Sequence, residues 1–64
     1  MKIIYDKEAD ILLIIFNDNV VVESDQLREG IIIDYNDQCK VVSIEILDAS
    51  KHTTDPTAIF YEVR

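Results

Sequence analysis

Short runs of β-branched and aromatic residues alternate with short polar breaks along the chain. Residues 2–5 are followed by the polar stretch 6–10 and then by the apolar run Ile11–Phe16. Two β-rich runs on either side of a polar break predict a β-hairpin. Residues 7–16 also contain good helix formers, but their apolar positions form one unbroken run rather than a stripe with the 3.6-residue period of a helix. The pattern therefore favours strands.

The middle of the chain continues this alternation. Asn17–Asn19 predicts a turn, because these residue types tolerate left-handed backbone conformations, and Val20–Val22 then predicts a further extended stretch. The mostly polar residues 24–29 are interpreted as a connection. Gly30 then leads into a strand predicted at Ile31–Tyr35.

The clearest strand signal lies at Lys40–Asp48, after a turn predicted at Asn36–Gln38. Apolar and polar side chains alternate there with a period of two, which one buried face would produce. The residues expected on the buried face are Val42, Ile44 and Ile46, and those expected on the wetter face include Ser43 and Glu45.

The last part of the chain permits two structures. Asp55-Pro56 either begins a short helix, with proline at its first position, or simply turns the chain. Ala58–Val63 is rich in β-formers and would add a last strand. The predicted fold class is mainly β, or small α+β. We expect an antiparallel meander of about four strands with a short C-terminal helix or strand, in one domain over residues 1–64.

The chain is short for the apolar surface that it carries. A fold of 64 residues buries only about 60% of the surface of its unfolded chain. The single cysteine, Cys39, excludes an internal disulfide, and metal-ligand pairs of cysteines are absent. Ile11–Phe16 and Ile31–Ile33 are apolar at consecutive positions, so both faces of these strands are apolar. With one sheet and no long amphipathic helix to cover it, we expect a homo-oligomer such as a dimer.

Charge and hydropathy restrict the classes of partner. Thirteen acidic residues against six basic ones give a formal net charge of −7, which repels phosphate backbones and anionic membranes. We therefore expect no direct nucleic-acid binding and no membrane association. The sequence has no signal-peptide pattern, and its longest apolar run is too short to span a bilayer, so the expected location is cytoplasmic. The same acidity suits either plain solubility or a basic protein partner.

One acidic cluster has the spacing with which a calcium-binding loop begins. Asp6, Glu8 and Asp10 alternate, but Ile11 stands where the loop needs glycine and Asn17 stands where it needs glutamate. The cluster is therefore interpreted as a solvated turn, and no metal site is assigned to it.

Recognisable catalytic motifs are missing. Cys39 and His52 flank the strand predicted at 40–48, which is roughly 25–30 Å long at about 3.3 Å per residue, so a nucleophile–base pair is not expected. The serines lie in no nucleophile elbow or phosphate loop. We expect no enzyme activity and no cofactor. The alternative is a small metal-dependent hydrolase that uses Asp34, Asp48 and His52.

Two segments, Lys2–Leu13 and Gly30–Ser50, resemble a small prokaryotic family named domain of unknown function 2283. The resemblance implies a short strand-rich domain without established catalytic or cofactor-binding residues. Three positions depart from it, because Glu29 stands where proline is frequent and Cys39 and Ser43 stand where glycine is common. The residues that carry the resemblance are Lys2, Ile3, Tyr5, Asp6, Ala9, Asp10 and Leu12, and later Gly30–Ile32, Asp34-Tyr35, Val41-Val42 and Ile44–Ser50.

The resemblance also implies an antitoxin-like role, because genes of this family are associated with small toxin-like proteins. The functional hypothesis is a non-enzymatic protein-interaction module that binds a basic, toxin-like partner by strand addition and charge complementarity. A self-assembling structural domain with no other partner is a further alternative. The candidate partner-binding residues are Asp6, Glu8, Asp10, Glu45 and Asp48.

Overall fold

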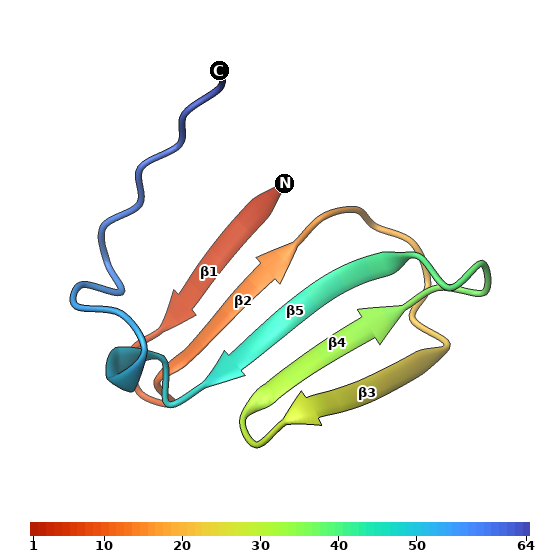
Figure 1. Cartoon of the computed structure of the whole chain (residues 1–64), viewed down its shortest axis with the longest axis horizontal. Helices are drawn as coiled ribbons and strands as arrows, with labels where there is room; N and C mark the ends of the chain where they lie inside the picture. The colour runs from red at the N-terminus through yellow and green to blue at the C-terminus, as the bar shows by residue number, and fades with distance from the viewer.

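Five antiparallel strands form one sheet in the computed structural model, which describes residues 1–64 (Figure 1). Mainly β is therefore the correct class, with five strands against the predicted four or so. A short 3-10 turn, η1 (Ala49–Lys51), follows the last strand, and residues 52–64 form neither helix nor strand. No helix in the chain has the length and apolar character needed to cross a membrane. The strands are β1 (Lys2–Asp6), β2 (Ile11–Ile15), β3 (Glu23–Arg28), β4 (Ile31–Tyr35) and β5 (Val41–Leu47).

The strand order is not that of the predicted meander. Across the sheet the order is β1-β2-β5-β4-β3, so the last strand lies at the centre between β2 and β4. After β2 the chain passes the ends of β5 and β4 and begins β3 at the far edge (Figure 1). Two successive hairpins then bring the chain back to β5. The strand with the clearest alternation in the sequence is thus the one with a neighbour on both sides.

The structure between β2 and β4 differs from the sequence prediction. Val20–Val22, predicted to be a strand, belongs to the connection, and Glu23–Arg28, which covers most of the predicted connection, is strand β3. β3 has one neighbour and is exposed along its whole length. Polar residues suit such an edge because they discourage pairing with other chains. Residue propensity alone therefore indicated the wrong segment.

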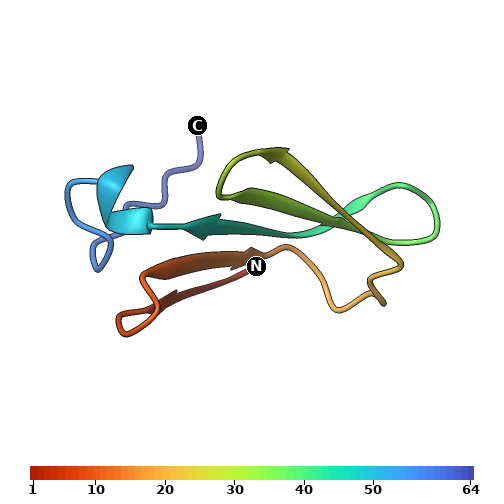
Figure 2. The same ribbon diagram turned by 90° about the horizontal axis from the view of Figure 1, so that it is seen from below.

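The sheet is a single layer that buries very few side chains. Only four residues are buried, namely Asn36, Val42, Ser43 and Ala49. Figure 2 views the molecule from below and shows a twisted sheet with neither a second sheet nor a long helix against it. Most side chains of β2, β4 and β5 are half-buried, because strands on either side shield them only laterally.

The register of the strands divides their side chains into two faces, since antiparallel partners share a face and successive residues alternate. One face carries two rows of apolar residues that cross β1, β2, β5 and β4. Ile44 and Ile46 lie in these rows, and Ser43 and Glu45 lie on the opposite face, as the alternation predicts. The predicted contrast in burial is wrong, because Ser43 is buried whereas Ile44 and Ile46 are only half-buried in the single layer. We define the apolar face by its eight residues, Ile3, Tyr5, Leu12, Ile14, Ile31, Ile33, Ile44 and Ile46.

The turns of all three hairpins contain a residue with a left-handed backbone, namely Asp10, Gly30 and Cys39. Gly30, between β3 and β4, has φ 82°, a value that glycine adopts without steric cost. Cys39, between β4 and β5, has φ 59° although it carries a side chain. The frequent glycine at this position in the family that the sequence resembles is thereby explained, because glycine adopts positive φ without steric cost.

We predict that glycine at position 39 stabilises the fold. A left-handed conformation costs a residue with a Cβ about 1–2 kcal/mol, and part of this gain is offset because glycine loses about 0.4–1 kcal/mol more entropy on folding. We expect Cys39→Gly to raise the free energy of unfolding by about 0.5–1 kcal/mol in urea denaturation. Cys39→Val is the opposing control, since a branched side chain disfavours positive φ further. A less stable C39G protein contradicts the assignment.

Candidate functional site

Asp10 joins the β1–β2 turn to the end of β5. Its carboxylate accepts hydrogen bonds from the Tyr5 hydroxyl at 2.6 Å, the Ser50 hydroxyl at 2.6 Å and the Ser50 amide at 3.0 Å. Its carbonyl oxygen accepts the Ala49 amide at 3.0 Å, and Ala49 is the most completely buried residue of the chain, at 1% exposure. One aspartate thus connects segments 40 residues apart in the sequence.

These hydrogen bonds change the acidity of both partners. The pKa of Asp10 lies below its ordinary value of 3.8, because the hydroxyls of Ser50 and then Tyr5 stabilise the carboxylate. The pKa of Tyr5 is raised above 10.0, because its hydroxyl donates to Asp10 and ionisation would lose that bond. Asp10 is therefore ionised at neutral pH, and its oxygens are occupied within the fold.

Asp6 and Asp48 also stabilise the turns in which they lie. Glu8 is the one candidate acid in a turn that accepts no hydrogen bond. The Asp6 Oδ1 accepts the amides of Glu8 and Ala9 at 3.0 and 3.1 Å. Asp48 has φ 51° and its carbonyl oxygen accepts the Lys51 amide, which begins the 3-10 turn. The acidic cluster at residues 6–10 is thus a hydrogen-bonded turn, in agreement with its interpretation from the sequence.

Glu45 is the one candidate acid within the sheet. It is half-buried in central strand β5, where Leu13 and Ile32 flank it on the two adjacent strands. It forms no ion pair, because the only salt bridge of the chain joins Arg64 to Glu62. A carboxylate between aliphatic side chains, without a cation, is a position where a partner's lysine or arginine gains a charge-assisted contact.

Around Glu45 the face opposite the apolar face combines aliphatic and polar groups, and we call it the mixed face. Asp34 on β4 accepts the Ser24 hydroxyl at 2.5 Å and the Ser43 hydroxyl at 2.6 Å, so one carboxylate bridges three strands. The residues of the mixed face are Lys2, Ile4, Asp6, Ile11, Leu13, Ile15, Ser24, Gln26, Ile32, Asp34, Ser43, Glu45 and Leu47.

The alternative metal site is not assembled. Asp34 pairs with Ser43 near the beginning of β5, whereas Asp48 and His52 follow its end. No group of three or more His, Cys, Asp or Glu side chains in the chain could hold a metal ion. Cys39 and His52 lie at opposite ends of β5, as the sequence indicates. The hydrolase alternative therefore has no support in this arrangement.

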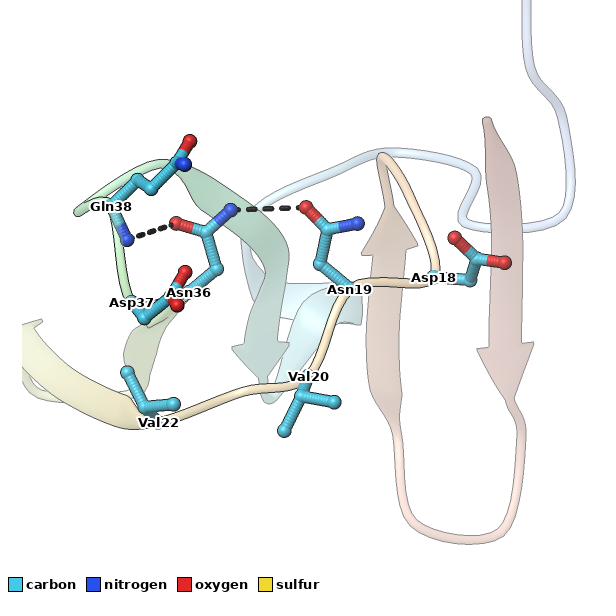
Figure 3. A pocket seen from close by; sticks show the side chains of 7 residues that line it. All are labelled: Asp18, Asn19, Val20, Val22, Asn36, Asp37 and Gln38. Carbon is cyan, nitrogen blue, oxygen red and sulfur yellow. Dashed lines mark hydrogen bonds between the residues drawn. The ribbon is translucent and has the colours of Figure 1, made fainter.

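The largest hollow lies where the β2–β3 connection passes the β4–β5 turn (Figure 3). It is open, has a volume of about 630 Å³ and carries Asp18 and Asp37 but no basic residue. Asn36 is buried at its base, where its Nδ2 donates to the Asn19 Oδ1 at 3.0 Å. The Asn36 Oδ1 accepts the amides of residues 38 and 40, at 2.9 and 3.0 Å.

Asn36 therefore connects two loops, and no local sequence pattern indicates this role. The two asparagine-containing turns, 17–19 and 36–38, were each assigned from local residue types. Their contact depends on the path of the chain around the end of the sheet, which a local pattern does not contain. Both polar atoms of the Asn36 side chain, Nδ2 and Oδ1, form hydrogen bonds within the fold.

No second sheet and no long helix of the chain covers the apolar face. Its eight side chains are all half-buried by their neighbours within the sheet, and none is buried. Edge strand β3 borders it with Asp25, opposite Ile33, and Arg28, opposite Ile31. An apolar centre with a charged border is the usual anatomy of a protein–protein interface.

The family model described as "Protein of unknown function (DUF2283)" matches residues 2–50. The chain belongs to the DUF2283 family. The match covers all five strands and ends at Ser50, so the Asp10–Ser50 link and both sheet faces lie within the DUF2283 domain. No curated protein and no solved structure matches the chain.

Residues that carry the DUF2283 resemblance contact one another in the fold. Tyr5, Asp10 and Ser50 share hydrogen bonds, and buried Ala49 bonds to the Asp10 carbonyl oxygen. Asp34 belongs to the bridge between β3, β4 and β5. These DUF2283 residues thus form hydrogen bonds that connect distant segments of the fold.

We expect the contributions of Asp10 and Ser50 to stability to be strongly coupled. Asp10→Asn and Ser50→Ala should each lower the free energy of unfolding in urea. The double variant should lose clearly less than the sum of the two, because each change breaks the same hydrogen bonds. Asp18→Asn is the control, since Asp18 is exposed and outside this network, and it should be neutral. Additive losses contradict the link.

The lowered pKa of Asp10 predicts a pH dependence of defined sign. Because its folded-state pKa lies below the unfolded value of 3.8, its stabilisation is present above that value and is lost as the pH falls through the folded-state pKa. Between about pH 6 and about pH 2.5, Asp10→Asn should therefore lose less stability than the wild type. If the unfolding free energies of the wild type and of Asp10→Asn fall equally with pH, ionised Asp10 does not stabilise the fold.

Proposed function

We propose that this DUF2283 domain is a non-enzymatic protein-interaction module that self-associates through its apolar face. The observation that carries the proposal is the single layer, in which eight apolar residues share a face and only four residues of the chain are buried. Stable domains are built from at least two packed layers, and burial of apolar area is worth about 25 cal/mol per Å². A second copy, face to face, supplies the missing layer.

A second copy suits the apolar face because the face is self-complementary. Two sheets pack about 10 Å apart through side chains that interdigitate, and a twofold axis places the same patch on both sides. The eight residues include no charged group, so no ionised side chain loses its hydration at the centre. At the border, β3 presents Asp25 and Arg28 together, so the twofold axis can bring opposite charges from the two copies together.

The non-enzymatic half of the proposal is supported by the distribution of perturbed groups. Tyr5, Asp10 and Asp55 each have a pKa that departs from its ordinary value. The pKa of Asp55 is lowered because the Thr57 hydroxyl and amide donate to its carboxylate. Active sites gather perturbed groups in a cleft. In this fold Tyr5, Asp10 and Asp55 form hydrogen bonds that stabilise turns, and none of the three lines the large hollow.

Adjacent residues of β2 allow a matched test, because Ile14 lies on the apolar face and Leu13 on the mixed face, and both are half-buried. We expect the wild type and Leu13→Lys to sediment as dimers. Ile14→Lys should dissociate, with a dissociation constant raised at least about 100-fold, because an unpaired charge would be buried. Circular dichroism confirms the fold of each variant. A dimer unaffected by I14K, or a monomeric wild type at high concentration, contradicts the proposal.

Binding of a basic, toxin-like partner is a second candidate function, favoured by Glu45. Self-association through the apolar face leaves the mixed face free, and Glu45 lies there between Leu13 and Ile32 without a cation. The net charge of −7 attracts a cationic protein. The partner that fits is an amphipathic segment with a lysine or arginine among aliphatic side chains. Glu45, rather than the acids of the turns, is the residue of the predicted set best placed to contact it.

An amphipathic leucine–lysine peptide serves as a defined probe of the mixed face. We expect Glu45→Gln to weaken its binding about tenfold in calorimetry at low salt, the loss of one charge-assisted contact. Glu8→Gln is the control, because it changes the net charge by the same amount at an exposed position in a turn. If both variants weaken binding equally, net charge alone attracts the peptide and the site assignment is wrong.

A further inference from the structure

Residues 58–63 carry the most exposed group of large apolar side chains in the chain. Phe60 is 100% exposed, and Ile59, Tyr61 and Val63 are 58%, 76% and 79% exposed. The Ala58 amide donates to the Asp55 carbonyl oxygen at 3.3 Å, and beyond it the backbone amides make no hydrogen bond. Exposed β-forming residues with unpaired backbone are typical of a segment that binds another chain.

The position of this segment relates it to the apolar face. In Figure 1 it runs alongside β1 in the opposite direction. Ile59 and Tyr61 line a shallow hollow together with Met1 and Ile3, and Ile3 is the end of one row of the apolar face. The segment therefore lies at the β1 border of the face that we propose as the contact with a second copy.

Within its own chain the segment covers almost nothing. The turn before it is held by Asp55, which accepts the Thr57 amide at 3.0 Å and the Thr57 hydroxyl at 2.6 Å. From this turn the chain runs along the β1 side of the sheet, outside the edge strand (Figure 1). Since Phe60 is wholly exposed, the segment gains little from its intramolecular position.

The apolar face alone is too small for a specific interface, and the exposed side chains of this segment can supply the missing area. Four strands about 4.8 Å apart and two rows about 7 Å apart cover roughly 300 Å². A specific interface removes at least about 500 Å² from each partner. The sheet faces alone fall short of that value, whereas a buried aromatic side chain contributes about 150–250 Å². Phe60 and Tyr61 therefore suffice to make up the difference.

We infer that residues 58–63 form an arm that crosses to the second copy and packs on the border of its apolar face. Each copy gives one arm and receives one, so the contact obeys the same twofold axis as the sheets. Six residues, 58–63, span about 20 Å when extended, which is enough to cross the roughly 10 Å between two packed sheets and reach the border of the partner's apolar face. This inference rests on the proposed self-association and identifies what completes its interface.

The test compares the dimer dissociation constants of full-length variants by sedimentation equilibrium. Phe60→Ser with Tyr61→Ser removes the two aromatic side chains, which are 100% and 76% exposed in the monomer. We expect the dissociation constant to rise at least about tenfold, because most of the added apolar area is lost. Val20→Ser is the matched control, because Val20 is 78% exposed in the β2–β3 connection, and it should leave the constant unchanged.

The outcomes separate the arm from the proposed function. A weaker dimer in the aromatic variant alone supports the arm. An unchanged constant overturns the arm and leaves self-association through the sheet intact. A tighter dimer also overturns it, because the segment would then compete for its own apolar face. A wild type that stays monomeric overturns both, and I14K then has nothing to dissociate.

Discussion

A sheet of one layer cannot bury its own side chains, and this constraint governs the whole DUF2283 domain. Each strand shields its neighbours laterally, but shielding from above needs a second layer. The central strands are rich in isoleucine and leucine on both faces, so the sequence provides more apolar surface than the chain can cover. The remaining apolar surface is the reason to look for function in contacts between chains.

What holds the single layer together is a small set of joints between distant segments. Asp10 connects the first turn to the 3-10 turn after β5, Asn36 connects two loops at the other end, and Asp34 bridges three strands. Each joint uses a polar side chain whose oxygens are occupied by donors from other segments. The carboxylates of this acidic domain therefore divide into those that accept hydrogen bonds within the fold, such as Asp10 and Asp34, and those that do not, such as Glu45.

The sequence predicted what depends on local pattern and missed what depends on topology. The alternation along residues 42–46 gave the two faces of β5 correctly, and the apolar run at β2 gave its strand. The valines at 20–22 misled, because β-branched residues in a connection resemble a strand, while edge strand β3 is polar and carries no such signal. The sequence does not distinguish among the candidate acids, whereas in the structure Asp6 and Asp10 accept hydrogen bonds within their turns and Glu45 lies in the sheet. No local pattern indicates that Asp10 meets Ser50, since the contact arises only after β5 takes the centre of the sheet.

The central claim is that another copy of the chain covers the apolar face, and isotope-filtered nuclear Overhauser spectroscopy on a mixture of labelled and unlabelled protein tests it most directly. The account predicts intermolecular contacts to the methyl groups of Ile14, Ile33 and Ile44, which lie in one row across the sheet. Methyl groups of Leu13 and Ile15, on the opposite side of the same strand, should show none. Intermolecular contacts confined to Leu13 and Ile15, or no intermolecular contacts in a concentrated sample, would contradict it.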